Sequence, residues 1–149
     1  MDLWERITAD AASESSVWAA ALLPSDARQR VAIWSPLVPD DIGLGLETVY
    51  EAYLVHYGRP RLFDTADPDE GVLLGDYLYA HGLVRIANEG GVTAVAAMAE
   101  LISRCAAMRA AGDDGDGDAW IAGARALGGE PGDDEVATAL ELHSARVGS

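Results

Sequence analysis

The sequence predicts an all-α fold, with about six or seven helices in a single domain over residues 1–149. Apolar residues recur at three- and four-residue intervals along most of the chain, the spacing that places them on one face of a helix. Strict alternation of apolar and polar residues, which indicates strands, is rare. Alanine and leucine, which favour helices, outnumber valine, isoleucine and threonine.

Residues 1–39 are expected to form N-terminal helices. A weakly periodic segment over 3–23 ends at Pro24, because proline cannot continue a helix. Ser25 and Asp26 can cap a short second helix that runs to about Trp34. Prolines at positions 36 and 39 then separate this part from the centre of the chain.

Residues 40–111 hold the central helices. The helix expected over 41–57 has the clearest amphipathic face, made of Leu46, Val49, Tyr50, Tyr53, Leu54 and Tyr57. After a stop at 58–60, the segment 72–88 is apolar nearly all round, which is typical of a helix at the centre of a domain. The glycine pair at 90–91 ends it, and a further helix follows over 92–111.

Residues 112–149 are expected to form an acidic loop (112–118), a short helix (119–127), a loop (128–133) and a last helix (134–146). The acidic loop has carboxylates at the first, third and fifth positions of a calcium loop that begins at Asp114. The sixth position, which needs glycine, is Ala119, and the twelfth, which needs a bidentate glutamate, is Arg125. An ordinary acidic linker is therefore the favoured interpretation.

The charge balance and the cysteine count exclude several classes of protein. The 25 acidic and 10 basic residues, all of the latter arginines, give a net charge of −15. Nucleic acids and anionic membrane surfaces need positive potential, so neither is an expected partner. The one cysteine, Cys105, allows no disulfide within the chain and no cysteine metal cage. No signal peptide or long uninterrupted apolar stretch is evident, and we expect a cytoplasmic protein without membrane insertion.

The polar residues taken alone indicate no catalytic site. His56, His81 and His143 are dispersed and lack the spacing of a helical metal site. A buried, structural Cys105 is the favoured interpretation of that residue. Glu47 and Glu51 lie off the apolar stripe, four residues apart, where a solvated helix face is more common than a magnesium site.

One part of the chain nevertheless resembles a known family. The segment 72–80 reads VLLGDYLYA, which resembles the central helix of trans-polyprenyl diphosphate synthases, typically V-L-x-G-D-Y-L-x-A; Gly75, Asp76 and Tyr77 match its core. The G-R-P at 58–60 looks like the tripeptide that follows the family's first aspartate-rich motif, and its distance from Gly75 matches the usual spacing. The resemblance covers about residues 40–127 and implies a truncated isoprenoid-synthase-like bundle.

The groups that handle diphosphate in that family are missing. Where catalytic members carry Asp-Asp-x-x-Asp, this chain has Glu47, Thr48 and Glu51, a poor copy for magnesium, which demands near-ideal octahedral geometry. The paired arginines before G-R-P are replaced by His56 and Tyr57, which cannot supply bidentate pairing to a diphosphate. The resemblance therefore implies no catalytic residue, no metal and no other cofactor on this chain.

Loss of motifs on a retained helical scaffold is similar to the small subunit of heterodimeric long-chain synthases of the hexaprenyl or heptaprenyl type. The resemblance then implies a regulatory subunit that activates a catalytic large subunit, which carries the magnesium, and helps to set chain length. Side-chain bulk at positions such as Ile42 and Gly43 limits product length in active members, so these two are candidate tunnel positions.

Two alternatives remain open. The chain can be an unrelated helical protein that homodimerises through the helix lined by Tyr50, Tyr53 and Tyr57, and self-association is also expected if the small subunit is purified alone. It can also be a reduced stand-alone prenyl or terpene synthase that uses Glu47, Glu51 and Asp76. That interpretation is disfavoured because ionising a diphosphate without its metal and arginine clamps leaves little transition-state stabilisation.

Overall fold

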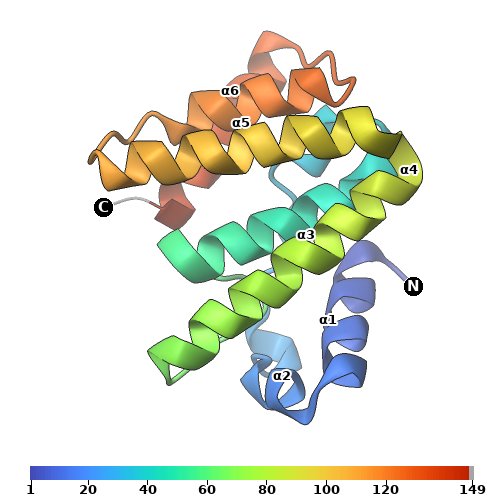
Figure 1. Cartoon of the computed structure of the whole chain (residues 1–149), viewed down its shortest axis with the longest axis vertical. Helices are drawn as coiled ribbons and strands as arrows, with labels where there is room; N and C mark the ends of the chain where they lie inside the picture. Colours follow the sequence, from blue (N-terminus) through green and yellow to red (C-terminus); the bar gives the residue numbers. More distant parts are fainter. Residues whose placement is uncertain (148–149) are drawn as a thin grey trace.

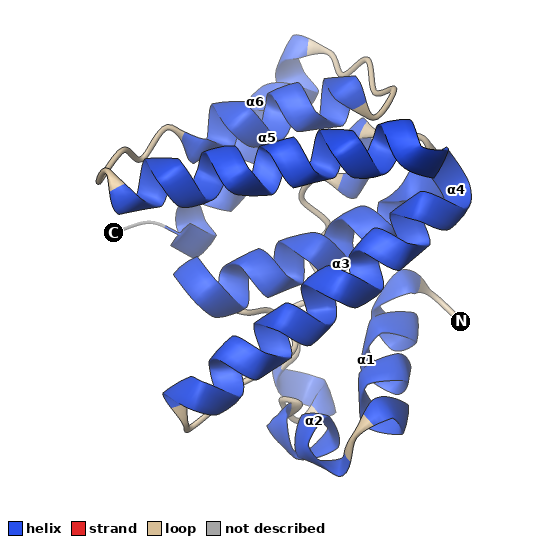
Figure 2. Ribbon diagram, viewed as in Figure 1, coloured by secondary structure: helices blue, strands red, loops and turns tan. Residues whose placement is uncertain are grey.

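The computed structural model describes residues 1–147 and contains six α-helices, with no β-strand in this range. The all-α prediction is therefore confirmed (Figure 2). The helices are α1 (Leu3–Glu14), α2 (Ser16–Ala21), α3 (Asp40–Tyr57), α4 (Pro68–Ala110), α5 (Asp116–Ala126) and α6 (Asp133–Val147). Short 3-10 turns at Ser25–Ala27 and Ser35–Leu37 lie in the long connection between α2 and α3.

Helices α3 and α4 form the centre of the molecule. The first arm of α4 crosses α3 and reaches the α1–α2 side, whereas its second arm runs beside α5, with α6 behind (Figure 1). The aromatic core lies between α3, α5 and α6, and a second apolar cluster lies between α1, α3 and the first arm of α4. The chain thus builds two connected cores on opposite sides of one central helix pair.

A kink at Gly91 divides α4 into two arms, 68–90 and 92–110. Gly91 has φ of 70° and ψ of −163°, which is not helical and which side chains with a Cβ rarely adopt. The chain is helical on both sides of this residue, but the axis bends sharply there (Figure 1). The helix end predicted at the glycine pair 90–91 corresponds to this kink.

Two glycines let α3 and α4 approach closely where they cross. A Cβ on Gly45 would lie 2.6 Å from Ile86 Cγ1 and 3.1 Å from the carbonyl oxygen of Gly82. A Cβ on Gly82 would in turn lie 2.6 Å from a methyl group of Val49. Neither position can take a side chain without moving a helix, so Gly45 thins the helix face for close packing.

The predicted helix from Ser25 to Trp34 is wrong. Only the turn Ser25–Ala27 forms, because the backbone N–H groups that a helix would use are engaged elsewhere. The amides of Ile33 and Trp34 donate to the Glu47 carboxylate, and the amide of Gln29 donates to the carbonyl of Arg61. The segment is therefore drawn out along α3 instead of coiling on itself.

Candidate functional site

Glu47 and Glu51 form, together with Arg61, the most deeply buried charged site among the described residues. Arg61 Nη1 lies 2.7 Å from Glu47 Oε1, and Arg61 Nε lies 2.9 Å from Glu51 Oε1. None of these three side chains reaches solvent. Burial lowers the pKa of Arg61, but the two carboxylates outweigh this and raise it, so the guanidinium stays charged.

Backbone amides occupy the remaining carboxylate oxygens of this cluster. Glu47 Oε2 accepts hydrogen bonds from the amides of residues 33, 34 and 35, at 2.8–3.0 Å. Glu51 Oε2 accepts from the amides of Arg61 and Leu62, both at 2.9 Å. The solvated-face interpretation of the two glutamates is wrong, because both point inward and tie two loop segments to α3. No carboxylate oxygen of the pair is left free to take a cation.

Thr48, which follows Glu47 on α3, joins a different set of contacts. Its hydroxyl donates to the carbonyl of Leu44 at 2.7 Å and accepts from Arg85 at 3.0 Å. Arg85 also forms an ion pair with Asp10, which links the first arm of α4 to α1. Thr48 therefore helps to hold the crossing helices together.

The residues of the family-like central helix lie on different sides of α4. Gly75 is buried because the imidazole of His56 lies directly over it. Asp76 is exposed, 3.8 Å from His56, whose pKa is lowered by burial more than this carboxylate raises it. Tyr77 stacks on Trp18 and on His81, at centroid distances of 6.1 and 5.4 Å. Gly75 and Tyr77 therefore serve packing between helices, whereas Asp76 faces solvent.

The candidate tunnel and interface positions are mostly internal. Ile42 and Gly43 are buried, and a Cβ on Gly43 would lie 3.1 Å from Ser35 Cβ, so both face this chain's own core. Tyr50 and Tyr53 have no exposed surface, and the prediction that they form an intermolecular interface is wrong, because α5 and α6 cover them. Tyr57 is 38% exposed.

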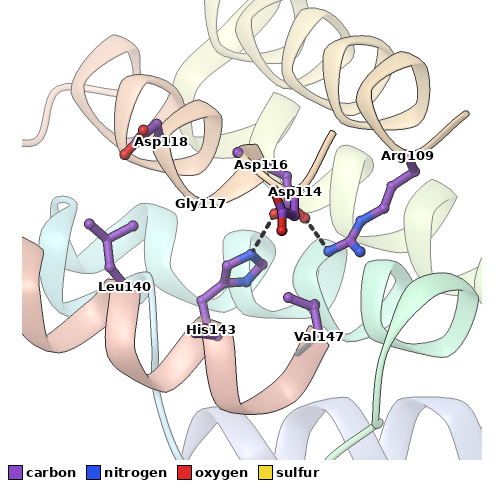
Figure 3. A pocket seen from close by; sticks show the side chains of 10 residues that line it. Arg109, Asp114, Asp116, Gly117, Asp118, Leu140, His143 and Val147 are labelled. Carbon is purple, nitrogen blue, oxygen red and sulfur yellow. Dashed lines mark hydrogen bonds and ion pairs between the residues drawn. The ribbon is translucent and has the colours of Figure 1, made fainter. Parts of the chain in front are cut away.

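A second polar cluster lies where α3, α5 and α6 meet, beside a cavity of about 260 Å³ (Figure 3). His143 Nδ1 lies 2.6 Å from the Tyr50 hydroxyl, and its Nε2 lies 3.1 Å from Asp116 Oδ1. The Tyr53 hydroxyl donates to Asp116 Oδ2 at 2.5 Å, and Arg109 Nη2 donates to the same atom at 2.6 Å. One carboxylate at the start of α5 thus joins α5 to α3, α4 and α6.

The electrostatics of this cluster favour an ionised Asp116. Burial alone raises the pKa of Asp116, but hydrogen bonds from His143, Tyr53 and Arg109 outweigh it and hold the pKa well below its usual range. Burial raises the pKa of both tyrosines above the usual value, so neither phenol ionises at neutral pH. Every member is hydrogen-bonded within the cluster, which makes it a clamp between helices and leaves no free nucleophile.

The sequence did not reveal Asp116 and His143 as a pair. The acidic-linker interpretation of 113–118 is wrong at Asp116, which is buried and begins α5. The two residues are 27 positions apart on different helices, and Tyr50 is 93 positions from His143. No local spacing connects them, although an aspartate within a glycine-rich stretch beside apolar residues was a weak signal of burial.

Metal-ligating geometry is absent from residues 1–147, where no three His, Cys, Asp or Glu side chains come together to hold an ion. The carboxylates at 113, 114 and 118 lie exposed around the loop and do not converge. Cys105 is buried, and burial raises the pKa of its thiol to about 11.

No family model, curated protein or solved structure matches this chain.

Proposed function

We propose that this chain is a non-catalytic subunit of a heteromeric polyprenyl diphosphate synthase, which activates a catalytic partner and influences product chain length. The proposal starts from the resemblance at 58–60 and 72–80. The observation that carries it is the ion-pair cluster of Arg61 with Glu47 and Glu51. At the positions where catalytic relatives bind magnesium, this chain has two carboxylates already bound to an arginine and to backbone amides.

Moving these carboxylates onto a metal would have a large energetic cost. A Mg²⁺ ion needs several oxygen ligands in a near-octahedral arrangement and keeps several waters, whereas this site is dry and packed. Releasing Arg61 from Glu47 and Glu51 would leave a buried positive charge without partners, at a cost of about 3–5 kcal/mol. The scaffold that relatives use to hold magnesium is here used for folding.

The side chains at the diphosphate-gripping positions support the same proposal. His56 packs over Gly75 and stacks on Tyr79 at a centroid distance of 5.4 Å. Tyr57 packs on Tyr53 at 4.8 Å. Neither His56 nor Tyr57 has the forked set of N–H donors with which an arginine binds a phosphate bidentately.

The test is reconstitution with a full-length prenyl synthase encoded in the same genome. Each protein alone and the mixture are assayed for prenyl transfer, and product lengths are resolved by chromatography. We expect no turnover by this chain alone, and a mixture that is faster or makes longer products than the partner alone. Transfer by this chain alone, or a mixture that behaves like the partner alone, would overturn the proposal.

A matched pair of variants separates a helper from a hidden catalyst. Asp76→Asn on this chain changes an exposed carboxylate that the stand-alone-enzyme alternative requires, so it should fold normally and leave the mixture unchanged. Replacing the first aspartate-rich motif of the partner should abolish activity. If Asp76→Asn instead removes activity while the partner variant retains it, the chemistry belongs to this chain.

A further inference from the structure

An apolar groove lies between the segment that precedes α3 and residues 134–142 of α6. Its larger hollow has a volume of about 250 Å³, and a second hollow of about 210 Å³ adjoins it at the loop 128–131. The two hollows are continuous, because Pro36, Leu37 and Glu135 line both. Apart from two acids and a threonine, the larger hollow is lined only by Ala32, Ile33, Pro36, Leu37, Ala139 and Leu142.

The groove is a fixed feature of the fold. Its floor is made of three residues that are each at most 4% exposed, Ile33, Leu37 and Ala139. The amides of residues 33–35 donate to the buried Glu47 carboxylate, which holds this wall against α3 and away from the hollow. Thr138 on the α6 side is exposed. A partner can therefore bind without first ordering the groove, which lowers the cost of binding.

The shape of the groove suits a peptide segment better than a compact small molecule. Each hollow is smaller than the volume of about 300–1,000 Å³ that is usual for small-molecule sites. The larger hollow follows α6 from Asp134 to Leu142, a length of about 12 Å at the helical rise per residue. A helix or an extended segment of that length can place successive apolar side chains in two adjoining hollows.

The charges that line the groove have one sign. Glu130, Asp134 and Glu135 line it, no arginine does, and none of the three forms an ion pair within residues 1–147. The α6 dipole favours Asp134 and Glu135 in the first turn of that helix. It does not account for Glu130, which lies in the loop before α6. The groove therefore combines an apolar floor with an acidic rim on two sides.

We propose that this groove binds a basic amphipathic segment of another protein. Large apolar side chains of that segment fill the two hollows, and its lysines or arginines pair with the three carboxylates of the rim. A second copy of this chain is a poorer occupant, because the acidic rim repels a chain with a net charge of −15. Nucleic acids are repelled for the same reason. The groove uses residues outside 58–60 and 72–80, so this inference does not depend on the prenyl synthase proposal.

The probe is a random peptide library displayed on phage and selected on the full chain. We expect enriched peptides to combine lysine or arginine with large apolar residues, and synthetic versions are then titrated by fluorescence anisotropy. Thr138→Arg places a bulky cation on the groove wall and should weaken binding at least about tenfold. Ala137→Arg adds the same charge at the neighbouring exposed position of α6, outside the groove, and should bind as the wild type does. Absence of enrichment, enriched peptides without basic residues, or equal binding by the two variants would each overturn the proposal.

A second pair of variants tests the charged rim without adding bulk. Asp134→Asn with Glu135→Gln should weaken binding of the enriched peptides at least about threefold and reduce its dependence on salt. Glu5→Gln with Glu141→Gln removes the same charge from exposed positions outside the groove and should leave the affinity unchanged. Equal losses in the two double variants would show general attraction to an acidic chain. If the purified chain forms a dimer that Thr138→Arg dissociates, the occupant is a second copy and the proposal is wrong.

Discussion

Arg61 Nη1 and Glu47 Oε1 form an ion pair 2.7 Å apart, and neither side chain is accessible to solvent. Glu47 is one of the two carboxylates for which the sequence alone left a magnesium site open as an alternative. The pair joins the loop after α3 to the middle of α3, and Glu47 also holds the segment before α3 through three amides. Two connections that lack regular secondary structure are thereby fixed to one helix.

Replacing Arg61 should therefore destabilise the fold strongly. Arg61→Met leaves two buried carboxylates without their cation, and we expect the free energy of unfolding to fall by about 3–5 kcal/mol in urea titrations. Arg59→Met, two residues away on an exposed side chain, is the control and should cost less than about 1 kcal/mol. Equal effects of the two variants would contradict a specific role for the buried pair.

The helix crossing makes a second prediction. Gly45→Ala places a methyl group 2.6 Å from Ile86 Cγ1, so α3 and α4 must separate, and overpacking of this kind costs about 1–3 kcal/mol. Gly132→Ala, where the nearest atom is 3.6 Å away, should change the melting temperature little. Thermal unfolding of both variants checks this, and a Gly45→Ala protein as stable as Gly132→Ala would show that the crossing is not tight.

The Asp116 cluster predicts how stability responds to acid. The pKa of the Asp116 carboxyl is lower in the folded chain than the ordinary 3.8. As the pH falls, this carboxyl therefore takes up its proton in the unfolded chain before it does so in the folded chain. The stabilisation is fully present at neutral pH and is lost progressively below about pH 4. Asp116→Asn removes this contribution, and its stability should change less than that of the wild type between pH 5 and pH 3. Parallel pH profiles for the two proteins would disprove the assignment.

The thiol offers a probe of the same region. Burial raises the pKa of Cys105 to about 11, and the side chain has no exposed surface, so little thiolate forms and no reagent reaches it at neutral pH. We expect Ellman's reagent to modify the native chain only as fast as it opens and the urea-unfolded chain at once. Rapid labelling of the native chain would show that the α4–α5 packing opens easily.

The helices were predictable where a buried apolar face and a solvent-exposed polar face alternate along the sequence with helical spacing. The boundaries expected for α3 differ from those observed by one residue, and the glycine pair at 90–91 marks the kink, because periodicity and backbone freedom are local properties. The segment 25–34 was not predictable, because its amides are claimed by Glu47, which lies in a helix further along the chain. Local capping signals carry no information about such a partner.

The polar clusters illustrate a similar limit. Glu47 and Glu51 are four residues apart. This spacing predicts that they share a helix face, but it does not predict whether that face is exposed to solvent. Both carboxylates are buried because Arg61 pairs with them. Arg61 lies beside them because the turn at 58–60 returns the chain along α3. Asp116 and His143 depend on how three helices meet, so their pairing exists only in the assembled fold.

The position of His143 also dictates the order in which the chain can finish folding. This imidazole lies 5.4 Å from the Trp34 ring and is bonded to Tyr50, so the last helix closes a cluster assembled from residues made much earlier. During synthesis, Trp34, Tyr50 and Trp120 must wait for residues 133–147 to leave the ribosome. Until α6 packs, the rings of Trp34 and Tyr50 lack part of their cover and present apolar surface that a chaperone can bind.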